Sequence, residues 1–577
     1  MPVGTARTWR DALPRAAVLG WVGALTAVLL WPLSWAGYPL GHDLVFTPRQ
    51  PLGLDSVGVS SAAPRAVPVD ALVALAEKLL DGAVVGRLAL VLPVVAAGTG
   101  VAALLGRRAL PARLAALSVA VWNPYVVERL ALGQWALLWA YAAVPWVILA
   151  AVRARSAAGW FALAVALAAA SITPTGGVIA ALVAVAVAAA GRSRRGVAAT
   201  AALAGVLQLP WLVPALVSGA GATSDPAGVA AFAARSEHPG GALLSLLDGG
   251  GIWDSVVVPS SRGGALPWLG LAVLAAAAGY GAPRLAAHLG RRLSLALAGT
   301  AAAGLVLAVL SSLPGGAAVA RVVVAHVPGA GLLRDAQKWV LPLVLLEALL
   351  VGAAVDRLWD RARVLPARIP LVVAALTLPL IVLPDAAATL RPTLQPVRYP
   401  RDWQVVAQRI GPGEAAVLPW GSYRSFGWVR SASVLDPAPR LLPGPTVVDD
   451  RLAVSGRLLA GENPHARAVG AALAGPAVAA DLARLGVAWV VVEHGTPGRV
   501  PDLGGLTLVF RGRDVSLFRV PAPVVTRHPS AARVAVVVAA DLLALLVLAG
   551  LAGTAGAGVV RAGAMRRKTP SDGQHRC

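Results

Sequence analysis

The stretch Trp122–Trp135, WNPYVVERLALGQW, lies between two long apolar segments of the chain. It contains Asn123–Pro124, a pair that interrupts helices, and then two charged residues, Glu128 and Arg129. Tryptophan and tyrosine are enriched where membrane helices meet water, and this stretch contains Trp122, Tyr125 and Trp135. We interpret it as a polar connection between two helices at a membrane surface.

The composition is that of a polytopic membrane protein. Of the 577 residues, 57% are hydrophobic and only 14% are charged, whereas soluble chains carry about a quarter charged residues. The formal net charge is +22, but the arginines separate apolar segments and do not form one basic face, so we exclude nucleic acid as a partner. The single cysteine, Cys577, allows no internal disulfide. The Ala, Gly, Val and Arg excess suggests a high-GC, actinobacterium-like genome.

Long apolar runs predict about twelve membrane-spanning helices, because a span needs about 20 such residues. The first run is interpreted as a retained anchor. Arginine clusters fall in every second connection, and such clusters stay in the cytoplasm. We therefore expect both termini to be cytoplasmic in a cell-membrane protein. The predicted spans lie near 16–36, 83–105, 112–127, 134–151, 157–172, 175–190, 197–217, 266–282, 293–313, 337–355, 368–385 and 531–553.

The spans divide the chain into four predicted parts. A transmembrane domain over 1–385 carries outer loops at 37–82 and 218–265. An extracytoplasmic α/β domain over 386–530 precedes the final span at 531–553 and a basic cytoplasmic tail at 554–577. In the α/β domain, EAAVLPW and VAWVVVEH predict strands, LTLVFRGRDVSLFRV predicts a hairpin, and the helical period over 464–486 predicts one helix that Gly486 caps.

The two outer loops on either side of the second and third predicted spans carry acidic residues. The first loop begins with His42 and Asp43 just beyond the first span, and residues 69–79 have the spacing of an amphipathic helix lying on the membrane. The second loop carries Glu128. Carboxylates at these positions are candidates for proton transfer outside the membrane.

This arrangement resembles the GT-C superfamily of polytopic glycosyltransferases, and WNPYVVERLALGQWALLWAYAAVPW is similar to segments of arabinofuranosyltransferase-like actinobacterial proteins. The resemblance covers about residues 16–385 in architecture and the two acidic loops in motif. It implies a GT-C-like helical fold and transfer of a sugar from a polyprenyl-phosphate donor to an envelope glycan or lipid acceptor on the outer face. The loops contain HDL and VER and no Asp-x-Asp, so a divalent metal such as Mg²⁺ or Mn²⁺ is left open.

On this reading Asp43 is the predicted base, and Glu128 is a second catalytic carboxylate that orients Arg129 or binds a metal. Arg129, Arg334 and Lys338 are the predicted donor-phosphate ligands, with Arg334 and Lys338 on one face of a helix start. Trp420, Tyr423 and Arg424 are candidates for contact with the sugar or acceptor.

Each of these residues also has an ordinary structural reading. Asp43 can be a simple loop acid, and Glu128 and Arg129 a solvated pair at the headgroups. Arg334 and Lys338 can bind anionic lipid in general, and residues 420–428 can form a core turn. At the level of function, the alternatives are a transporter or flippase for a lipid-linked precursor, with a midplane cavity around Glu347, and a non-catalytic envelope scaffold.

Overall fold

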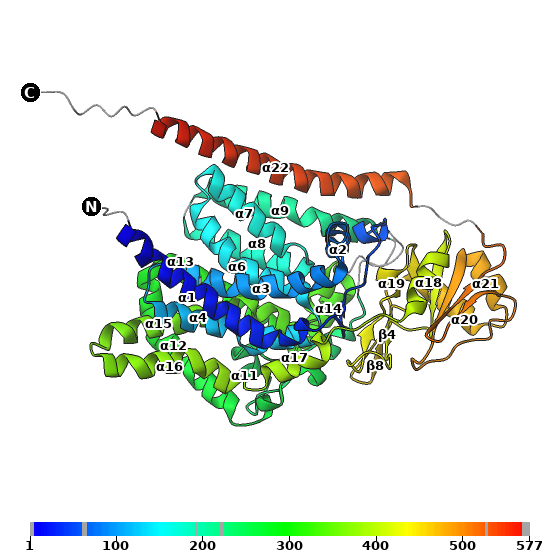
Figure 1. Ribbon diagram of the computed structural model, residues 1–577, viewed down its shortest axis with the longest axis horizontal. Helices are drawn as coiled ribbons and strands as arrows, with labels where there is room; N and C mark the ends of the chain where they lie inside the picture. The colour runs from blue at the N-terminus through cyan, green and yellow to red at the C-terminus, as the bar shows by residue number, and fades with distance from the viewer. Residues whose placement is uncertain (1–4, 60–65, 192, 219–223, 525–528, 568–577) are drawn as a thin grey trace, which may run out of the picture.

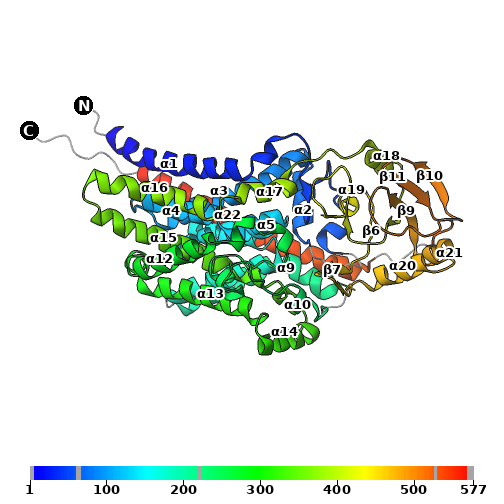
Figure 2. The same ribbon diagram turned by 90° about the horizontal axis from the view of Figure 1, so that it is seen from below.

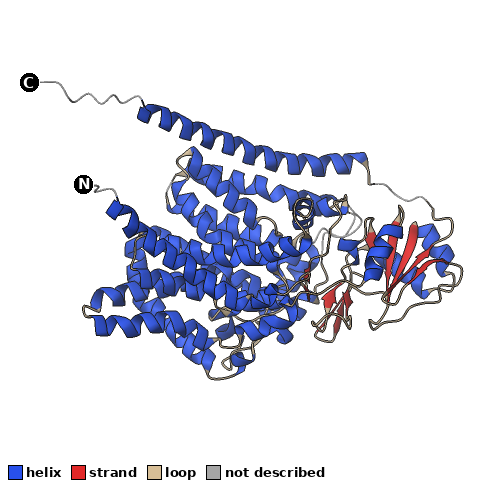
Figure 3. Ribbon diagram, in the orientation of Figure 1, coloured by secondary structure: helices blue, strands red, loops and turns tan. Residues whose placement is uncertain are grey.

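The protein is a helical bundle joined to a smaller domain that contains a β-sheet (Figure 1, Figure 3). The computed structural model describes residues 5–59, 66–191, 193–218, 224–524 and 529–567. Nine helices in these ranges are long and apolar enough to cross a membrane. The chain is therefore a multi-pass membrane protein, as its composition predicts.

Each of the twelve predicted spans contains a helix of the bundle. Three of these helices are shorter than a full span, because α4, α7 and α8 have 12, 14 and 17 residues. The bundle helices are α1 (Thr5–Leu29), α3 (Gly82–Leu104), α4 (Leu110–Val121), α6 (Trp135–Arg153), α7 (Ala157–Ala170), α8 (Pro174–Ala190), α9 (Arg194–Val217), α12 (Leu266–Leu289), α13 (Arg291–Leu310), α15 (Leu341–Arg361), α16 (Leu365–Val382) and α22 (Ala531–Arg567).

The bundle is organised around α15, which packs against α4, α12 and α13. Most of the α15 span is buried by these neighbours. In contrast, α16 is apolar along its length and has no buried residue. A helix that is apolar but unburied by protein must face lipid, so α16 lies at the periphery.

Short elements gather at the end of the bundle that meets the sheet domain, which we call the sheet-domain end. Among them, α2 (Val69–Ala76) lies across the direction of the bundle helices and is seen nearly end-on in Figure 1 and side-on in Figure 2. The others are η1 (Trp31–Ser34), β1 (Leu40–Gly41), β2 (Leu44–Val45), η2 (Asp55–Val57), α5 (Pro124–Ala131), α10 (Gly228–Ala231), α11 (Ala242–Leu247), η3 (Ser255–Val257), η4 (Ser260–Gly263), α14 (Pro314–His326), η5 (Ala330–Leu333), η6 (Ala336–Val340) and α17 (Ala386–Leu394).

The opposite end of the bundle collects arginines and is called the arginine-rich end. Helix α1 begins there and α22 ends there, on the side away from the sheet domain (Figure 1). Asp356 near the end of α15 binds Arg284 at 2.6 Å and lies 3.7 Å from Arg108 in the α3–α4 connection. Arginines of two predicted cytoplasmic connections therefore meet at this end of the bundle.

The smaller domain contains a five-stranded sheet of order β10-β11-β9-β3-β6, in which β3 pairs in parallel with β6 and β9. All seven residues of β9 are buried because helices cover both faces of the sheet. Its elements are α18 (Arg401–Arg409), β3 (Glu414–Leu418), β4 (Tyr423–Arg424), β5 (Val434–Leu435), α19 (Ala438–Leu441), β6 (Thr446–Val447), β7 (Leu452–Val454), β8 (Arg457–Leu459), α20 (Pro464–Ala474), α21 (Val478–Leu485), β9 (Val487–Glu493), β10 (Thr507–Arg511) and β11 (Val515–Arg519).

The strands and the hairpin predicted for this domain are present as β3, β9 and β10–β11. The prediction of a single helix over 464–486 is wrong, because the chain forms α20 and α21 with a break at Gly475–Pro476. Proline restricts the residue before it and ends the first helix. Gly486 caps α21 with a φ of +82°, as predicted.

Candidate functional site

The stretch 122–135 folds as the end of α4, the short helix α5 and the start of α6. The Asn123 side chain joins the first two, because its amide donates to the carbonyl of Val119 (2.8 Å) and its oxygen accepts from the backbone N–H of Val126 (2.9 Å). Pro124 then occupies the first position of α5. Every residue of α5 is buried. The sequence therefore directs Glu128 and Arg129 into the protein, and the reading of the two as a solvated pair is wrong.

Arg129 forms the centre of a first cluster. Its guanidinium donates two hydrogen bonds to Asp335, at 2.7 and 2.8 Å, and a third to the Gln134 side-chain oxygen at 2.5 Å. The side chain is fully buried. A paired, bidentate geometry is the arrangement that allows an arginine to be enclosed in this way.

Asp43 and Lys338 complete this cluster. The Gln134 amide donates to one carboxylate oxygen of Asp43 at 3.3 Å, and the Lys338 ammonium lies 3.5 Å from Asp335. Lys338 also interacts electrostatically with Asp43. We call Asp43, Arg129, Gln134, Asp335 and Lys338 the Asp43 cluster. It joins three segments that are distant in the sequence, and both Asp43 and Lys338 remain partly exposed.

The charges of the Asp43 cluster keep Asp335 ionised. Burial by itself raises the pKa of a carboxyl group, but the positive charges of Arg129 and Lys338 outweigh burial and hold the pKa of Asp335 below its usual value. Asp335 thus fixes both cations in place.

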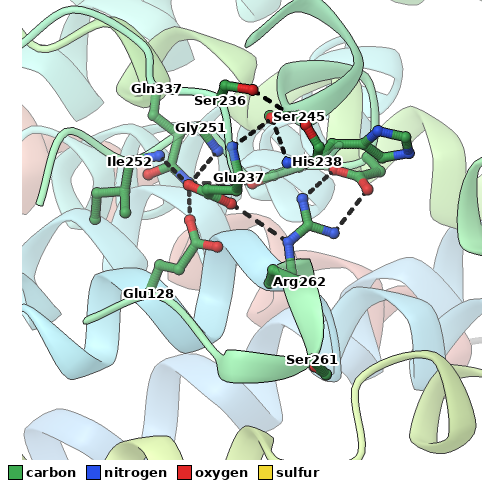
Figure 4. A network of polar contacts seen from close by, with 12 residues as sticks. Glu128, Ser236, Glu237, His238, Ser245, Gly251, Ile252, Ser261, Arg262 and Gln337 are labelled. Carbon is green, nitrogen blue, oxygen red and sulfur yellow. Dashed lines mark hydrogen bonds and ion pairs between the residues drawn. The ribbon is translucent and has the colours of Figure 1, made fainter. Parts of the chain in front are cut away.

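A second cluster lies on the other side of α5 and is shown in Figure 4. Arg262 donates to Asp248 at 2.7 and 2.6 Å and to Glu237 at 3.3 Å. The Gln337 amide donates to Glu128 and to the carbonyl of Gly249. We call Glu128, Glu237, Asp248, Arg262 and Gln337 the Glu128 cluster. It ties the long connection between α9 and α12 to α5 and η6.

The Glu128 cluster encloses the side chains of three carboxylic acids and one arginine. Burial raises the pKa of Glu128 well above its usual value and also raises the pKa of Glu237. A raised pKa favours the neutral form of a carboxyl group, which lowers the cost of burying it.

Glu128 and Arg129 are neighbours in sequence but belong to different clusters, so Glu128 does not orient Arg129 directly. The expectation that Arg334 and Lys338 share one face of a helix is also wrong. Arg334 follows η5, and its guanidinium lies 3.5 Å from Glu462 and over the ring of Phe232. Lys338 lies in η6 and turns toward Asp335.

The three aromatic and basic candidates of the sheet domain have different surroundings. Trp420 is half-buried and packs against the core formed by α20 and α21. Arg424 is buried and paired with Asp436 and Glu493, so its guanidinium is not placed to stack on a sugar. Tyr423 is 40% exposed, and its hydroxyl donates to Asp43 at 2.5 Å.

Sequence reasoning missed several residues of the two clusters, above all Gln134, Arg262 and Gln337. Glu237 and Asp248 lie in glycine-rich stretches of the predicted outer loop at 218–265. The available signal was charge in an apolar setting, because carboxylates are rarely buried without a partner. That signal predicts that each buried carboxylate has a partner, but it does not predict which arginine is the partner.

The described part of the chain does not bring three His, Cys, Asp or Glu side chains into an arrangement that would hold a metal ion. In the Asp43 cluster, the carboxylates are already bound by Arg129, Gln134 and Tyr423. Lys338 adds a positive charge that interacts with Asp43.

Comparison with known proteins identifies the fold. No family model matches the sequence, and no curated protein is significantly similar to it. Among solved structures, the arabinofuranosyltransferase AftD from mycobacteria superposes with a TM-score of 0.55 at 19% identity, over 89% of this chain and 40% of AftD. The chain has the GT-C fold. At this identity the likeness establishes the GT-C fold alone, and the chain spans less than half the length of AftD.

Two further solved structures match with lower TM-scores. ArnT from Cupriavidus metallidurans matches at a TM-score of 0.43 and 14% identity, over 91% of this chain and 100% of ArnT. The Archaeoglobus fulgidus oligosaccharyltransferase matches at 0.43 and 11%, over 83% of this chain and 68% of that protein. These two likenesses are too weak to carry an argument about this chain.

Proposed function

We propose that this protein is a membrane glycosyltransferase that moves a sugar from a polyprenyl-phosphate donor to an envelope glycan or lipid acceptor on the outer side of the membrane. One observation carries the proposal. The Asp43 cluster places a partly exposed carboxylate beside Lys338 at the sheet-domain end of a GT-C bundle. A base and a cation side by side are the groups that transfer from a lipid phosphate needs.

In the proposed reaction, an acceptor hydroxyl attacks the anomeric carbon of the donor sugar. Asp43 accepts the hydroxyl proton while the new carbon–oxygen bond forms and the bond from that carbon to the phosphate oxygen breaks. The departing lipid phosphate gains negative charge, which the partly exposed Lys338 stabilises. Arg129 is enclosed by Asp335 and Gln134, so it acts by holding Asp335, which in turn holds Lys338.

Glu128 has a supporting role in this scheme. Its carboxyl group is fully buried and binds Gln337, the residue before Lys338. It therefore fixes η6, which carries Lys338 and follows Asp335 directly. Arg334 lies apart, against Glu462, and is not assigned a role in donor binding.

Two other functions receive less support. A transporter needs a polar path near the middle of the membrane, whereas one cavity between α3, α6, α8, α13 and α15 is lined by apolar side chains and Thr300. A non-catalytic scaffold gives no reason for burying two polar clusters beside an exposed carboxylate, since enclosing charges costs stability.

The test is transfer from a panel of polyprenyl-phosphate sugars by the purified protein and its Asp43→Asn variant. We expect Asp43→Asn to lower kcat by about 100-fold or more, because a positioned base contributes at least that factor. Asp70→Asn is the matched control, because Asp70 lies in the same loop but pairs with Arg440 at 3.0 Å outside the cluster. Transfer by folded Asp43→Asn protein at the wild-type rate would contradict the proposal.

A further inference from the structure

The loop that carries Asp43 is built into the sheet domain. The backbones of Tyr38 and Val397 exchange two hydrogen bonds of 2.9 Å. The side chains of Leu40 and Val45 are buried in the core that surrounds Trp403 of the sheet domain. The first outer loop therefore depends on the sheet domain for its shape, although more than 300 residues separate them in sequence.

The residue before Asp43 has a left-handed backbone that the sheet domain holds. His42 has a φ of +46°, which is uncommon for a residue with a side chain. Its N–H donates to the carbonyl of Ser433 at 3.0 Å, and its carbonyl accepts from the N–H of Leu435 at 2.7 Å. These two bonds bracket Val434 of β5. Such conformations persist only where the surroundings impose them, and they concentrate at functional sites.

The hairpin of β4 and β5 also aims a side chain at Asp43. Arg424 points into the sheet domain, where Asp436 binds its guanidinium at 2.6 Å and Glu493 binds it as well. Successive side chains of a strand point in opposite directions. Tyr423 therefore points out of the domain, and its hydroxyl reaches Asp43.

The carboxylate of Asp43 is thus held from two sides. Tyr423 of the sheet domain donates to one oxygen at 2.5 Å, and Gln134 of the bundle donates to the other at 3.3 Å. Two donors on different oxygens fix both the position and the plane of a carboxylate. Proton transfer requires such fixed geometry.

We propose that Tyr423 is a positioning residue that orients the Asp43 carboxylate, so that the sheet domain completes the reaction centre. The expected effect on kcat rests on the proposed function. The expected effect on the exposure of Asp43 to reagents rests on the geometry alone. The sequence had suggested that Tyr423 contacts sugar, and the two roles are separable. The hydroxyl serves Asp43, whereas a sugar would stack on the ring.

The kinetic test compares Tyr423→Phe with Tyr399→Phe. Tyr399 is a matched control, because its hydroxyl joins the same two parts of the protein through the carbonyl of Phe46 (3.1 Å) and does not contact Asp43. We expect Tyr423→Phe to lower kcat roughly 10- to 100-fold with KM within about twofold of wild type, since a hydrogen bond to a charged group has that effect on a rate. Tyr399→Phe should stay within about threefold of wild type in kcat. Equal losses in both variants would overturn the proposal in favour of general docking.

A second measurement does not need enzyme activity. The full-length protein is treated with a water-soluble carbodiimide and an amine, and labelling of Asp43 is followed by mass spectrometry. We expect Tyr423→Phe to raise labelling at Asp43 by at least about threefold, because the carboxyl loses a bound donor, while Tyr399→Phe leaves it at the wild-type level. Unchanged labelling in Tyr423→Phe would overturn the inference. If no form of the protein transferred sugar, the proposed function would fail and the labelling would still decide the role of Tyr423.

Discussion

Gly133 sets how closely the second outer loop approaches Asp43. It has a φ of +82°, and a Cβ atom at this position would lie 2.3 Å from the backbone nitrogen of Leu44 and 2.9 Å from the carbonyl carbon of Asp43. The N–H of Asp43 also donates to the carbonyl of Leu132 at 3.0 Å. A side chain at position 133 must therefore push the first loop away.

We expect Gly133→Ala to lower the free energy of unfolding by about 1–3 kcal/mol through backbone strain and to reduce sugar transfer, because Asp43 moves with its backbone. Gly53→Ala is the control, since Gly53 lies in the same loop as Asp43 and has nothing within 4 Å of an added Cβ. Thermal unfolding and transfer assays of both variants measure the two effects. A Gly133→Ala protein as stable and active as Gly53→Ala would show that the close approach is unimportant.

At the residue scale, the sequence indicated which charged residues belong to the site better than it indicated which residues they contact. Asp43, Arg129 and Lys338 were singled out because charge is rare in so apolar a chain, and the structure brings these three together. Gln134, which connects Arg129 to Asp43, is uncharged and carries no comparable signal. Which arginine meets which carboxylate depends on contacts across 206 residues, as between Arg129 and Asp335, and local spacing does not encode such contacts.

At the element scale, periodicity and composition located the helices because burial in lipid demands long apolar runs. The wrong helix boundaries lie where a residue that interrupts helices falls inside a periodic apolar run. The predicted span at 112–127 is divided by Asn123, which caps α5, and the predicted helix at 464–486 is divided before Pro476. The predicted helix start near 337 is a 3-10 turn, and α15 begins at Leu341.

The residue directly after helix α2 is a buried acid whose ionisation opposes folding. Glu77, just after α2, is buried, and burial raises its pKa to about 7, although the N–H of Gln50 donates to it. In the unfolded chain its pKa is near 4.3. Between these values the folded protein binds more protons than the unfolded one, so the contribution of Glu77 to stability falls as pH rises from about 4.3 to 7.

We therefore expect the wild-type protein to lose thermal stability between pH 5 and 8 more steeply than Glu77→Gln, which cannot ionise there. The amide oxygen of glutamine can still accept from Gln50. Unfolding temperatures in one detergent across this pH range measure the difference between the two slopes, and other titrating groups cancel in that difference. Parallel curves for the two proteins would contradict the assignment.

At the scale of the whole molecule, the polar side chains of the sheet-domain end form a continuous junction between the bundle and the sheet domain. Besides Tyr423 and Asp43, Arg440 binds Asp70, and Glu462 accepts from Ser224 at 2.8 Å. The sequence predicted each part, but for the sheet domain it predicted only contact with the sugar or acceptor. The junction instead makes the first loop and the sheet domain one structural unit.

The orientation of this unit relative to the membrane follows from the distribution of arginine. Positive residues near span ends remain in the cytoplasm, and the short connections of the arginine-rich end carry them in clusters such as Arg153 and Arg155. The sheet-domain end should then face outward. Single-cysteine variants made in a Cys577→Ser background can test this, because the chain has no other cysteine.

We expect a membrane-impermeant maleimide to label Asp502→Cys in intact cells and to label Arg155→Cys only after the cells are permeabilised. Both positions are exposed in the fold, so a difference between them reports the side of the membrane and not burial. The natural Cys577, left in place in a third sample, should behave like Arg155→Cys because the basic tail is predicted to be cytoplasmic. Labelling of Arg155→Cys and not of Asp502→Cys in intact cells would place Asp43 and Lys338 on the inner side, where the proposed acceptors of the envelope are absent.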